Sequence, residues 1–111
     1  MVRLPQPASA FQGREQIGIR PAVIVQNELA FSLLPTVLVT PFTSNLGALR
    51  FNGTSLVKST ARNGLDRDSV LLVFQTRAID RNRIERFMGK LDDLDLQRLD
   101  TLLQQLLLPN N

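Results

Sequence analysis

The sequence contains no histidine, cysteine, tryptophan or tyrosine among its 111 residues. Without cysteine there is neither a disulfide nor a thiolate zinc site, which is typical of proteins from a reducing compartment. Without histidine the commonest acid–base group is missing, and both Ser–His–Asp and Cys–His nucleophile systems are excluded. A catalytic site in this chain must therefore use Arg, Thr, Glu or amide side chains.

The sequence also has no recognisable membrane span, signal peptide or cofactor-binding motif. No apolar run approaches the roughly 20 residues that span a bilayer, and the first ten residues lack the layout of a signal peptide. No glycine-rich phosphate loop is present, and the acids at residues 92–95 stand where a helix cap is expected, so we expect no cofactor and no metal. The length fits one domain over residues 1–111. We expect a soluble, cytoplasmic protein without membrane contact.

Charge is unevenly distributed along the chain. Residues 1–77 carry eight basic side chains and four acidic ones, whereas residues 78–111 carry five and six. No acid lies between Glu28 and Asp66, and eleven of the 13 basic residues are Arg. Because the planar guanidinium suits phosphate, this pattern favours a polyanionic partner. The alternative is an ordinary solvated surface that is rich in Arg.

The order of apolar runs predicts a mainly β protein. Val/Ile-rich or alternating segments predict strands over residues 21–27, 36–42, 55–58 and 69–76, and a further short strand over 49–51. The continuous apolar run of the 69–76 strand indicates burial on both faces. Asn63-Gly64 predicts a tight turn. Residues 81–88 are expected to form one or two helical turns. We expect a strongly bent antiparallel sheet or half-open barrel with helices attached.

The C-terminal third predicts a helix over about 93–108. Asp92 or Asp93 can cap it, and Pro109 ends it. Five leucines recur at three- and four-residue spacing, so this face is expected to pack on the sheet: Leu96, Leu99, Leu103, Leu106 and Leu107.

Four polar residues are candidates for chemistry, each with an ordinary structural explanation. Arg20, before Pro21, can be a solvated loop side chain, and Thr43 can serve turn geometry at a strand end. Glu15 can be a surface carboxylate. Gln75 interrupts an apolar strand, so it is either a satisfied buried amide or a group directed at a ligand.

Three segments taken together resemble the MazF/PemK family of toxin endoribonucleases. They are GREQIGIRPAVIVQN (13–27), PTVLVTPFTSN (35–45) and RDSVLLVFQTRAIDRNRI (67–84), and the likeness runs in order from about Gly13 to Leu107. The resemblance implies an α+β, mainly β fold, an SH3-like small barrel of antiparallel strands with a C-terminal helix. It also implies a homodimer that cuts single-stranded RNA, including mRNA, without metal, and a cognate antitoxin whose acidic C-terminal segment blocks the RNA groove.

The resemblance also implies roles for individual residues. Arg20 and Thr43 match the key Arg and the key Thr or Ser of the family, and Glu15 is our candidate base for activating the 2′-hydroxyl. Arg20 would neutralise the phosphorane, a role that suits its high pKa better than proton donation does. The remaining candidates are expected to bind RNA, with Phe42 stacking on a base: Gln16, Phe42, Ser44, Asn45, Arg50, Lys58, Gln75 and Arg77.

The chain departs from the family pattern at two places. Many members carry an acid just before the Gln of the fourth strand, where this chain has Phe74. Residues 1–5 match only the last part of the usual first strand, so we expect that strand to be truncated. The alternative function is therefore a catalytically weak or inactive SH3-like module that binds RNA or an antitoxin without cleaving.

Overall fold

The computed structural model describes residues 2–5, 19–25 and 33–107, with residues 2–5 and 19 described by their backbone alone. The strands are β1 (Val2–Pro5), β2 (Ile19–Ile24), β3 (Thr36–Thr43), β4 (Thr54–Val57), β5 (Ser69–Leu72), β6 (Arg77–Asp80) and β7 (Arg86–Phe87). Short 3₁₀ helices are η2 (Leu46–Arg50), η3 (Val73–Gln75) and η4 (Arg81–Arg83), and the chain continues into α2 (Asp93–Leu107).

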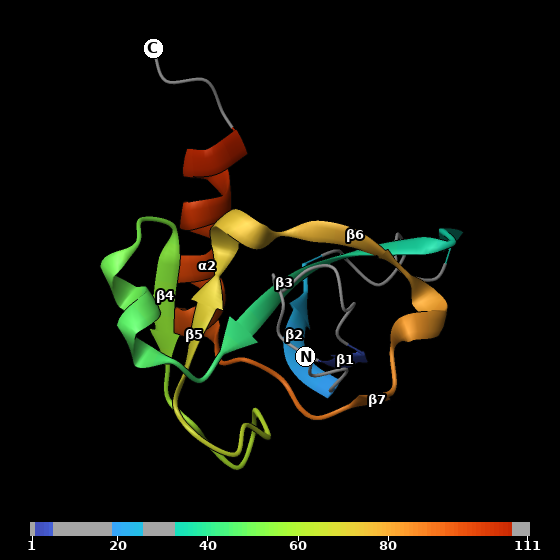
Figure 1. Ribbon diagram of the computed structural model, residues 1–111, viewed down its shortest axis with the longest axis horizontal. Coiled ribbons are helices and arrows are strands. Elements are labelled where there is room, and N and C mark those ends of the chain that lie inside the picture. Colours follow the sequence, from blue (N-terminus) through green and yellow to red (C-terminus); the bar gives the residue numbers. More distant parts are fainter. Residues whose placement is uncertain (1, 6–18, 26–32, 108–111) are drawn as a thin grey trace.

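The strands form one antiparallel sheet around β3. Its order is β4-β5-β3-β2-β1-β7, and β6 also pairs with β3 (Figure 1). Within the described part of the chain no ladder joins β4 to β7, so the bent sheet is a small barrel that stays open. The predicted mainly β fold with a C-terminal helix is confirmed. The predicted strands over 21–27, 36–42 and 55–58 correspond to β2, β3 and β4.

The predicted strand over 69–76 is interrupted. All four residues of β5 are buried, as the apolar run indicated, but the chain then turns through η3 before it resumes as β6. The ladder between β3 and β6 ends at Val39, and the ladder between β3 and β5 begins at Phe42. Thr40 and Pro41 lie between these ladders. Proline has no backbone N–H to donate, and it is tolerated at position 41 because neither of these ladders includes that residue.

One other local prediction was wrong and a second was right in part. The segment 49–51 is not a strand, because the Asn45 side chain accepts a hydrogen bond from the Gly47 backbone N–H and begins η2. Of the one or two helical turns expected over residues 81–88, the structure has one 3₁₀ turn, η4, which the short strand β7 follows. Both 3₁₀ helices begin at a side-chain cap, and caps of this kind depend on a single Asn or Asp.

Strand β1 lies in the interior of the sheet. It pairs with β2 along Val2–Pro5 and with β7 at Val2 and Arg3. The four residues of β1 therefore hold two other strands together. The expectation that the first strand is truncated stays a prediction.

The turn predicted at Asn63-Gly64 is confirmed. Gly64 has a φ of 72°, and a Cβ there would collide with the Met88 carbonyl oxygen. The buried Asn63 amide accepts hydrogen bonds from the backbone N–H groups of Thr60 and Leu65 and donates one to the Lys58 carbonyl. A glycine is required next to it because both the positive φ and the close approach exclude a side chain.

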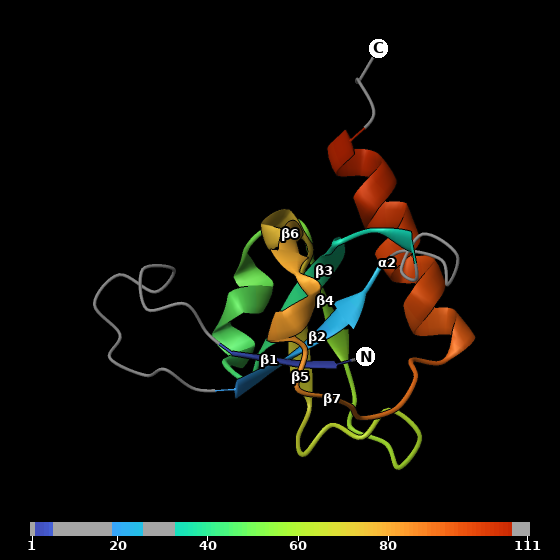
Figure 2. The ribbon, with the colours of Figure 1, turned by 90° about the vertical axis from the view of Figure 1, so that its right-hand side faces the viewer.

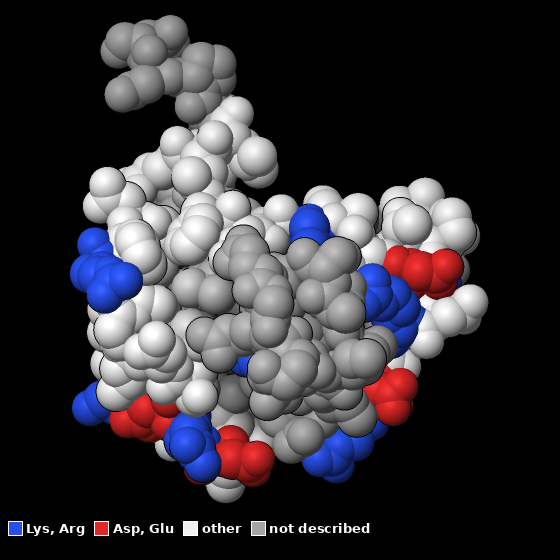
Figure 3. All heavy atoms as spheres, in the orientation of Figure 1, with Lys and Arg blue, Asp and Glu red and all other residues white. Residues whose placement is uncertain are grey.

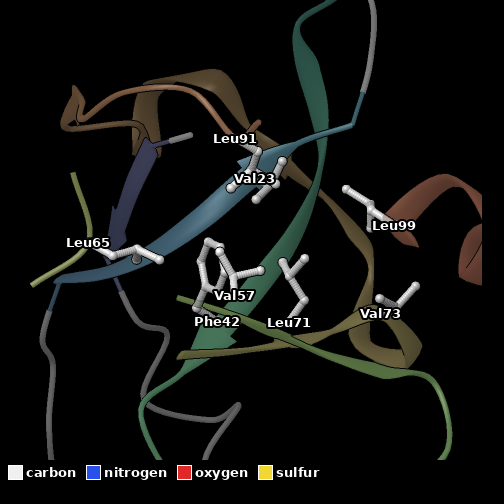
Figure 4. Packing of buried hydrophobic residues seen from close by; sticks show 8 residues of the cluster. All are labelled: Val23, Phe42, Val57, Leu65, Leu71, Val73, Leu91 and Leu99. Atoms are coloured by element: carbon white, nitrogen blue, oxygen red, sulfur yellow. The ribbon is translucent and has the colours of Figure 1, made fainter. Parts of the chain in front are cut away.

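The main core lies between the sheet and α2. It contains Val23, Phe42, Val57, Leu65, Leu71, Val73, Leu91 and Leu99, which converge in Figure 4 from several strands and the helix. A second cluster packs on the opposite face of β2 and β3, and it consists of Ala22, Val37, Val39 and Ile79. Each large side chain buried in these clusters contributes about 1.5–3 kcal/mol relative to exposure.

Only part of the leucine face of α2 reaches the core. The helix packs beside β4 and η3, at the edge of the sheet seen in Figure 2. Leu99 is 3% exposed and Leu102 and Leu103 pack partly against the core, whereas Leu96, Leu106 and Leu107 are exposed. The prediction that the whole face packs on the sheet was therefore wrong, because α2 touches the sheet over a short length. No helix in the described residues is long and apolar enough to cross a bilayer.

Candidate functional site

The pairing of β2 with β3 brings Arg20 and Thr43 to the same face. The paired residues run from Ile24–Val39 to Ala22–Pro41. The ladder ends at that pair, and continuing its antiparallel register by two residues would set Arg20 opposite Thr43. Because side chains alternate between faces, both point to the side on which Ala22 and Val39 pack. The cation and the hydroxyl, 23 residues apart in sequence, therefore come from adjacent strand ends.

The Thr43 hydroxyl has a turn function and retains a proton to donate. Its oxygen accepts a hydrogen bond of 3.2 Å from the Asn45 backbone N–H. A hydroxyl carries one donor as well as its acceptor lone pairs, so this contact leaves the O–H available to an external oxygen. Ser44 and Asn45 are exposed, and the Asn45 side-chain oxygen caps η2. Thr43 and Asn45 therefore do have the predicted turn function. This function uses the Thr43 oxygen as an acceptor and leaves its O–H free to donate.

Gln75 and Arg77 lie on the segment that links β5 to β6. Gln75 is exposed at the end of η3, so it is not a buried amide satisfied by its surroundings. Arg77 is half-buried and pairs with Val39 of β3. The Thr76 hydroxyl holds this segment to β3, because it donates to the Val73 carbonyl at 2.8 Å and lies 2.6 Å from the Thr40 hydroxyl. Gln75 is therefore a polar group presented to solvent by a fixed turn.

Phe42 does not serve as a base-stacking residue. Its side chain is 2% exposed and belongs to the main core, on the face of β3 opposite to Thr43. Successive side chains of a strand point to opposite faces of the sheet. Because Thr43 points to one face of β3, Phe42 points to the other, which is the core. The prediction that Phe42 stacks on RNA was wrong, because neither face of its ring is accessible.

The other predicted residues are not gathered at the Arg20–Thr43 position. Arg50 ends η2, where its guanidinium carbon lies 4.7 Å from the centre of the Phe51 ring. Lys58 is exposed directly after β4. Glu15 and Gln16 lie outside the described residues, so their roles stay predictions. Figure 3 shows one face of the molecule, with basic side chains spread around its edge and several acidic ones beside them.

Sequence reasoning missed a pair of exposed aromatic rings. Phe51 and Phe74 meet edge to face with their ring centres 6.2 Å apart, and they are 49% and 44% exposed. Phe74 was noticed only as a departure from a family pattern, and its contact with Phe51 depends on a close approach of two segments 23 residues apart.

The acids at the start of α2 act on the helix. The Asp92 carboxylate accepts a hydrogen bond of 2.8 Å from the Asp95 backbone N–H, which makes Asp92 the N-cap. Burial raises the pKa of Asp95, and the charge of Asp92 and a hydrogen bond with it raise that pKa further against the opposing effect of Arg98. Within the described ranges, no group of three or more potential ligands gathers to hold a metal ion.

An open antiparallel barrel with a C-terminal helix and an Arg–Thr pair at adjacent strand ends defines a class of small β proteins. Comparisons with known proteins identify the family within that class. A family model described as PemK-like, MazF-like toxin of type II toxin–antitoxin system matches residues 2–107. The chain therefore belongs to the PemK-like, MazF-like toxin family.

Individual relatives agree with this assignment. Endoribonuclease MazF of Staphylococcus saprophyticus is 35% identical over 92 residues, which cover 83% of this chain and 76% of that protein. Endoribonuclease EndoA of Bacillus subtilis is 34% identical over 92 residues, covering 83% and 78%. A crystal structure of MazE–MazF from Deinococcus radiodurans aligns with a TM-score of 0.71 at 26% identity, over 96% of this chain and 89% of that one.

Proposed function

We propose that this chain is the toxin of a type II toxin–antitoxin pair and that it cleaves single-stranded RNA in the cytoplasm. Support comes from the family to which it belongs and from two relatives named endoribonucleases. The observation that supports the proposal is the β2–β3 ladder, whose register, continued by two residues beyond Ala22–Pro41, would set Arg20 opposite Thr43 on one face. A fixed cation beside a hydroxyl donor suits a phosphate group that gains charge during reaction.

The proposed reaction needs no group beyond those of the protein and the RNA. The ribose 2′-oxygen attacks the adjacent phosphorus, and the bond from phosphorus to the 5′-oxygen breaks. The 2′-hydroxyl proton passes to a base, and the leaving oxygen takes up a proton. The products are a 2′,3′-cyclic phosphate and a 5′-hydroxyl.

Each proposed residue has a separate task in this reaction. Arg20 neutralises the phosphorane, and Thr43 donates a hydrogen bond to a phosphate oxygen and holds the in-line geometry. Glu15 is the proposed base, and Gln16 is a proposed RNA contact. Exposed Ser44, Asn45 and Gln75 would contact unpaired bases, because such bases present free hydrogen-bonding edges.

The proposal includes two protein partners. A second copy of the chain would form a homodimer, and a cognate antitoxin with an acidic C-terminal segment would occupy the RNA site. The related Deinococcus structure is a MazE–MazF assembly, which supports the second partner. The acid-free stretch between Glu28 and Asp66 also suits an acidic segment, since it carries Arg50, Lys58 and Arg62.

The cleavage proposal is tested with purified protein and single-stranded RNA in EDTA. We expect fragments that end in a cyclic phosphate or a 3′-phosphate, and we expect Arg20→Ala to abolish cutting. Arg67→Ala is the matched control, because Arg67 is an exposed arginine outside the site. Full-length RNA after incubation with folded wild-type protein would refute the cleavage proposal.

The same experiment tests the alternative function. A module that binds RNA or an antitoxin without cleaving is favoured by Phe74, which stands where many family members carry an acid. That function predicts salt-dependent RNA binding by the wild-type protein with no fragments. Cleavage in EDTA would exclude it.

A further inference from the structure

The exposed ring pair of Phe51 and Phe74 lies beside a cation. Arg50 stacks over one ring, and the second ring meets the first edge to face. The chain has six Phe and no Tyr or Trp, and Phe51 and Phe74 are two of the three exposed phenylalanines among the residues that the structure describes. Exposed aromatic faces next to an arginine are the groups on which unpaired nucleic-acid bases stack.

The backbone holds both rings in place before any ligand arrives. The Phe51 N–H donates to the Ala48 carbonyl at 3.0 Å, and its carbonyl accepts from the Thr54 hydroxyl at 2.8 Å. The Gly53 carbonyl accepts from the N–H groups of Val73 at 2.8 Å and Phe74 at 3.3 Å. The η2–β4 connection is thereby bound to η3, so main-chain contacts fix the backbone of both residues, and the two rings contact each other edge to face.

The backbone conformation at residue 53 favours glycine. Gly53 has a φ of 77°, which residues with a side chain rarely adopt. A Cβ there would lie 3.4 Å from the Phe74 Cβ, an ordinary van der Waals contact. A rigid ring pair loses little conformational entropy on binding, which favours stacking.

The ring pair is also connected to the proposed site along the chain. Phe74 directly precedes Gln75, and Phe51 directly follows η2, whose N-cap is Asn45. Both polar residues are proposed RNA contacts. No acid lies in the sequence between Glu28 and Asp66, so the stretch that contains Phe51 favours an anionic ligand.

We propose that Phe51 and Phe74 form a stacking surface for one unpaired base of the RNA substrate and that Phe74 determines which bases this chain accepts at that position. The inference rests on the proposed RNA cleavage. Stacking tolerates every base, whereas a carboxylate accepts hydrogen bonds only from bases with suitably placed amino groups. This chain should therefore be less selective at that position than a relative with an acid there.

A protein segment is the alternative ligand for this surface. The two ligands would contact different sets of rings. A groove of about 530 Å³ runs beside the ring pair and is lined by Phe51, Leu49, Leu102 and Leu106, among others, but not by Phe74. A protein segment in that groove would depend on Phe51 alone. A base stacked on the ring pair would depend on both rings.

The experiment compares Phe51→Leu, Phe74→Leu and Phe74→Glu with wild type. Phe87→Leu is the control, because Phe87 is also an exposed phenylalanine but lies on β7. A mixed-sequence single-stranded RNA is cut in EDTA, and the product ends are sequenced. Rates are then measured on the preferred sequence, and chemical denaturation verifies that each variant is folded.

Both leucine variants should lower kcat/KM by roughly 5- to 100-fold, the range expected for the loss of one base–aromatic stack. Phe74→Glu should still cut but narrow the base preference at one position, and Phe87→Leu should match wild type. Unchanged rates and unchanged cut sites in folded Phe51→Leu and Phe74→Leu would overturn the inference. So would an effect of Phe51→Leu alone, which would show that Phe74 takes no part in binding the base.

Failure of the proposed function gives a different result. In that case wild type and every variant, including Phe87→Leu, leave the RNA intact. Failure of the stacking inference leaves wild-type cleavage in place, with the same sequence preference in all four variants.

Discussion

At the scale of single residues, neighbours in sequence have opposite surroundings. Phe42 is buried in the core, and Thr43, the next residue, is directed to the opposite face. Thr40 is fully buried and polar, so its hydroxyl needs a partner. That partner is Thr76, and because the Thr76 proton is given to the Val73 carbonyl, Thr40 is the donor of the pair. This chain of hydrogen bonds fixes η3 against β3.

The hydroxyl pair gives a prediction with a built-in comparison. Thr76→Val should lower the free energy of unfolding by about 1–3 kcal/mol, because it leaves the buried Thr40 hydroxyl without its acceptor. Thr40→Val should cost less, since Thr76 keeps its bond to Val73. The double variant should lose less unfolding free energy than the sum of the losses in the two single variants. Urea denaturation of the four proteins measures this, and strict additivity would contradict the pairing.

At the scale of elements, α2 begins at a cap and is held to the core by a short stretch of its length. The cap also brings two carboxylates close together. The pKa of Asp95 is raised, first by burial and then by Asp92, so its folded form holds the proton more tightly than the unfolded form does. Stability from this group is therefore present at acid pH and is lost as the pH rises through the pKa of folded Asp95.

Two substitutions at Asp92 separate the cap from the charge. Asp92→Ala removes the acceptor of the Asp95 N–H and should lower stability by about 1 kcal/mol. Asp92→Asn keeps an acceptor and removes the charge, so it should preserve the helix and bring the pKa of Asp95 closer to its ordinary value. Denaturation and an NMR titration of Asp95 check both expectations. Equal loss of stability in the two variants would show that the cap is unimportant.

The leucines of α2 give a second prediction for this element. Leu99 is 3% exposed, so Leu99→Ala should cost about 2–5 kcal/mol of unfolding free energy. Leu106 is 49% exposed, and Leu106→Ala should change the free energy of unfolding by about 0.5 kcal/mol or less. Thermal denaturation at low protein concentration is the measurement. Similar costs at both positions would mean that the whole leucine face is packed within one chain.

At the scale of the whole molecule, charge placement matters more than net charge. The formal net charge is only +3, but no acid lies in the sequence between Glu28 and Asp66. Single-stranded RNA releases counterions when cations bind its phosphates, so binding should weaken with salt. Two exposed lysines distinguish local from overall charge: Lys58 lies in the acid-free stretch, and Lys90 lies close to the acids at the start of α2.

We therefore expect Lys58→Gln to weaken RNA binding and to reduce the slope of log affinity against log salt by about 0.7, the value for one phosphate contact on a single strand. Lys90→Gln removes the same charge and should leave the slope unchanged. Fluorescence anisotropy with 2′-O-methylated RNA, which cannot be cleaved through its 2′-oxygen, provides the measurement. Equal slopes in both variants would show that only net charge matters.

Much of the architecture follows from local pattern. The Val/Ile-rich runs, the Asn63-Gly64 turn and the Asp92-capped helix were predictable, because strand periodicity, positive φ and capping are properties of neighbouring residues. Arg20 and Thr43 were identifiable as candidates by resemblance, and the register between β2 and β3, continued by two residues, would set them opposite each other.

Other features depended on segments that are distant in sequence. The break after β5, the buried position of Phe42 and the exposed leucines of α2 follow from how the sheet bends and how little of the helix it contacts. Phe51 and Phe74 meet because the Gly53 carbonyl accepts hydrogen bonds from the Val73 and Phe74 N–H groups, a contact that no pattern within either segment specifies. The absence of histidine and cysteine limited the chemistry from the beginning. Which of the remaining polar and aromatic groups share a surface depended on long-range packing, because only packing sets the distance between residues far apart in the chain.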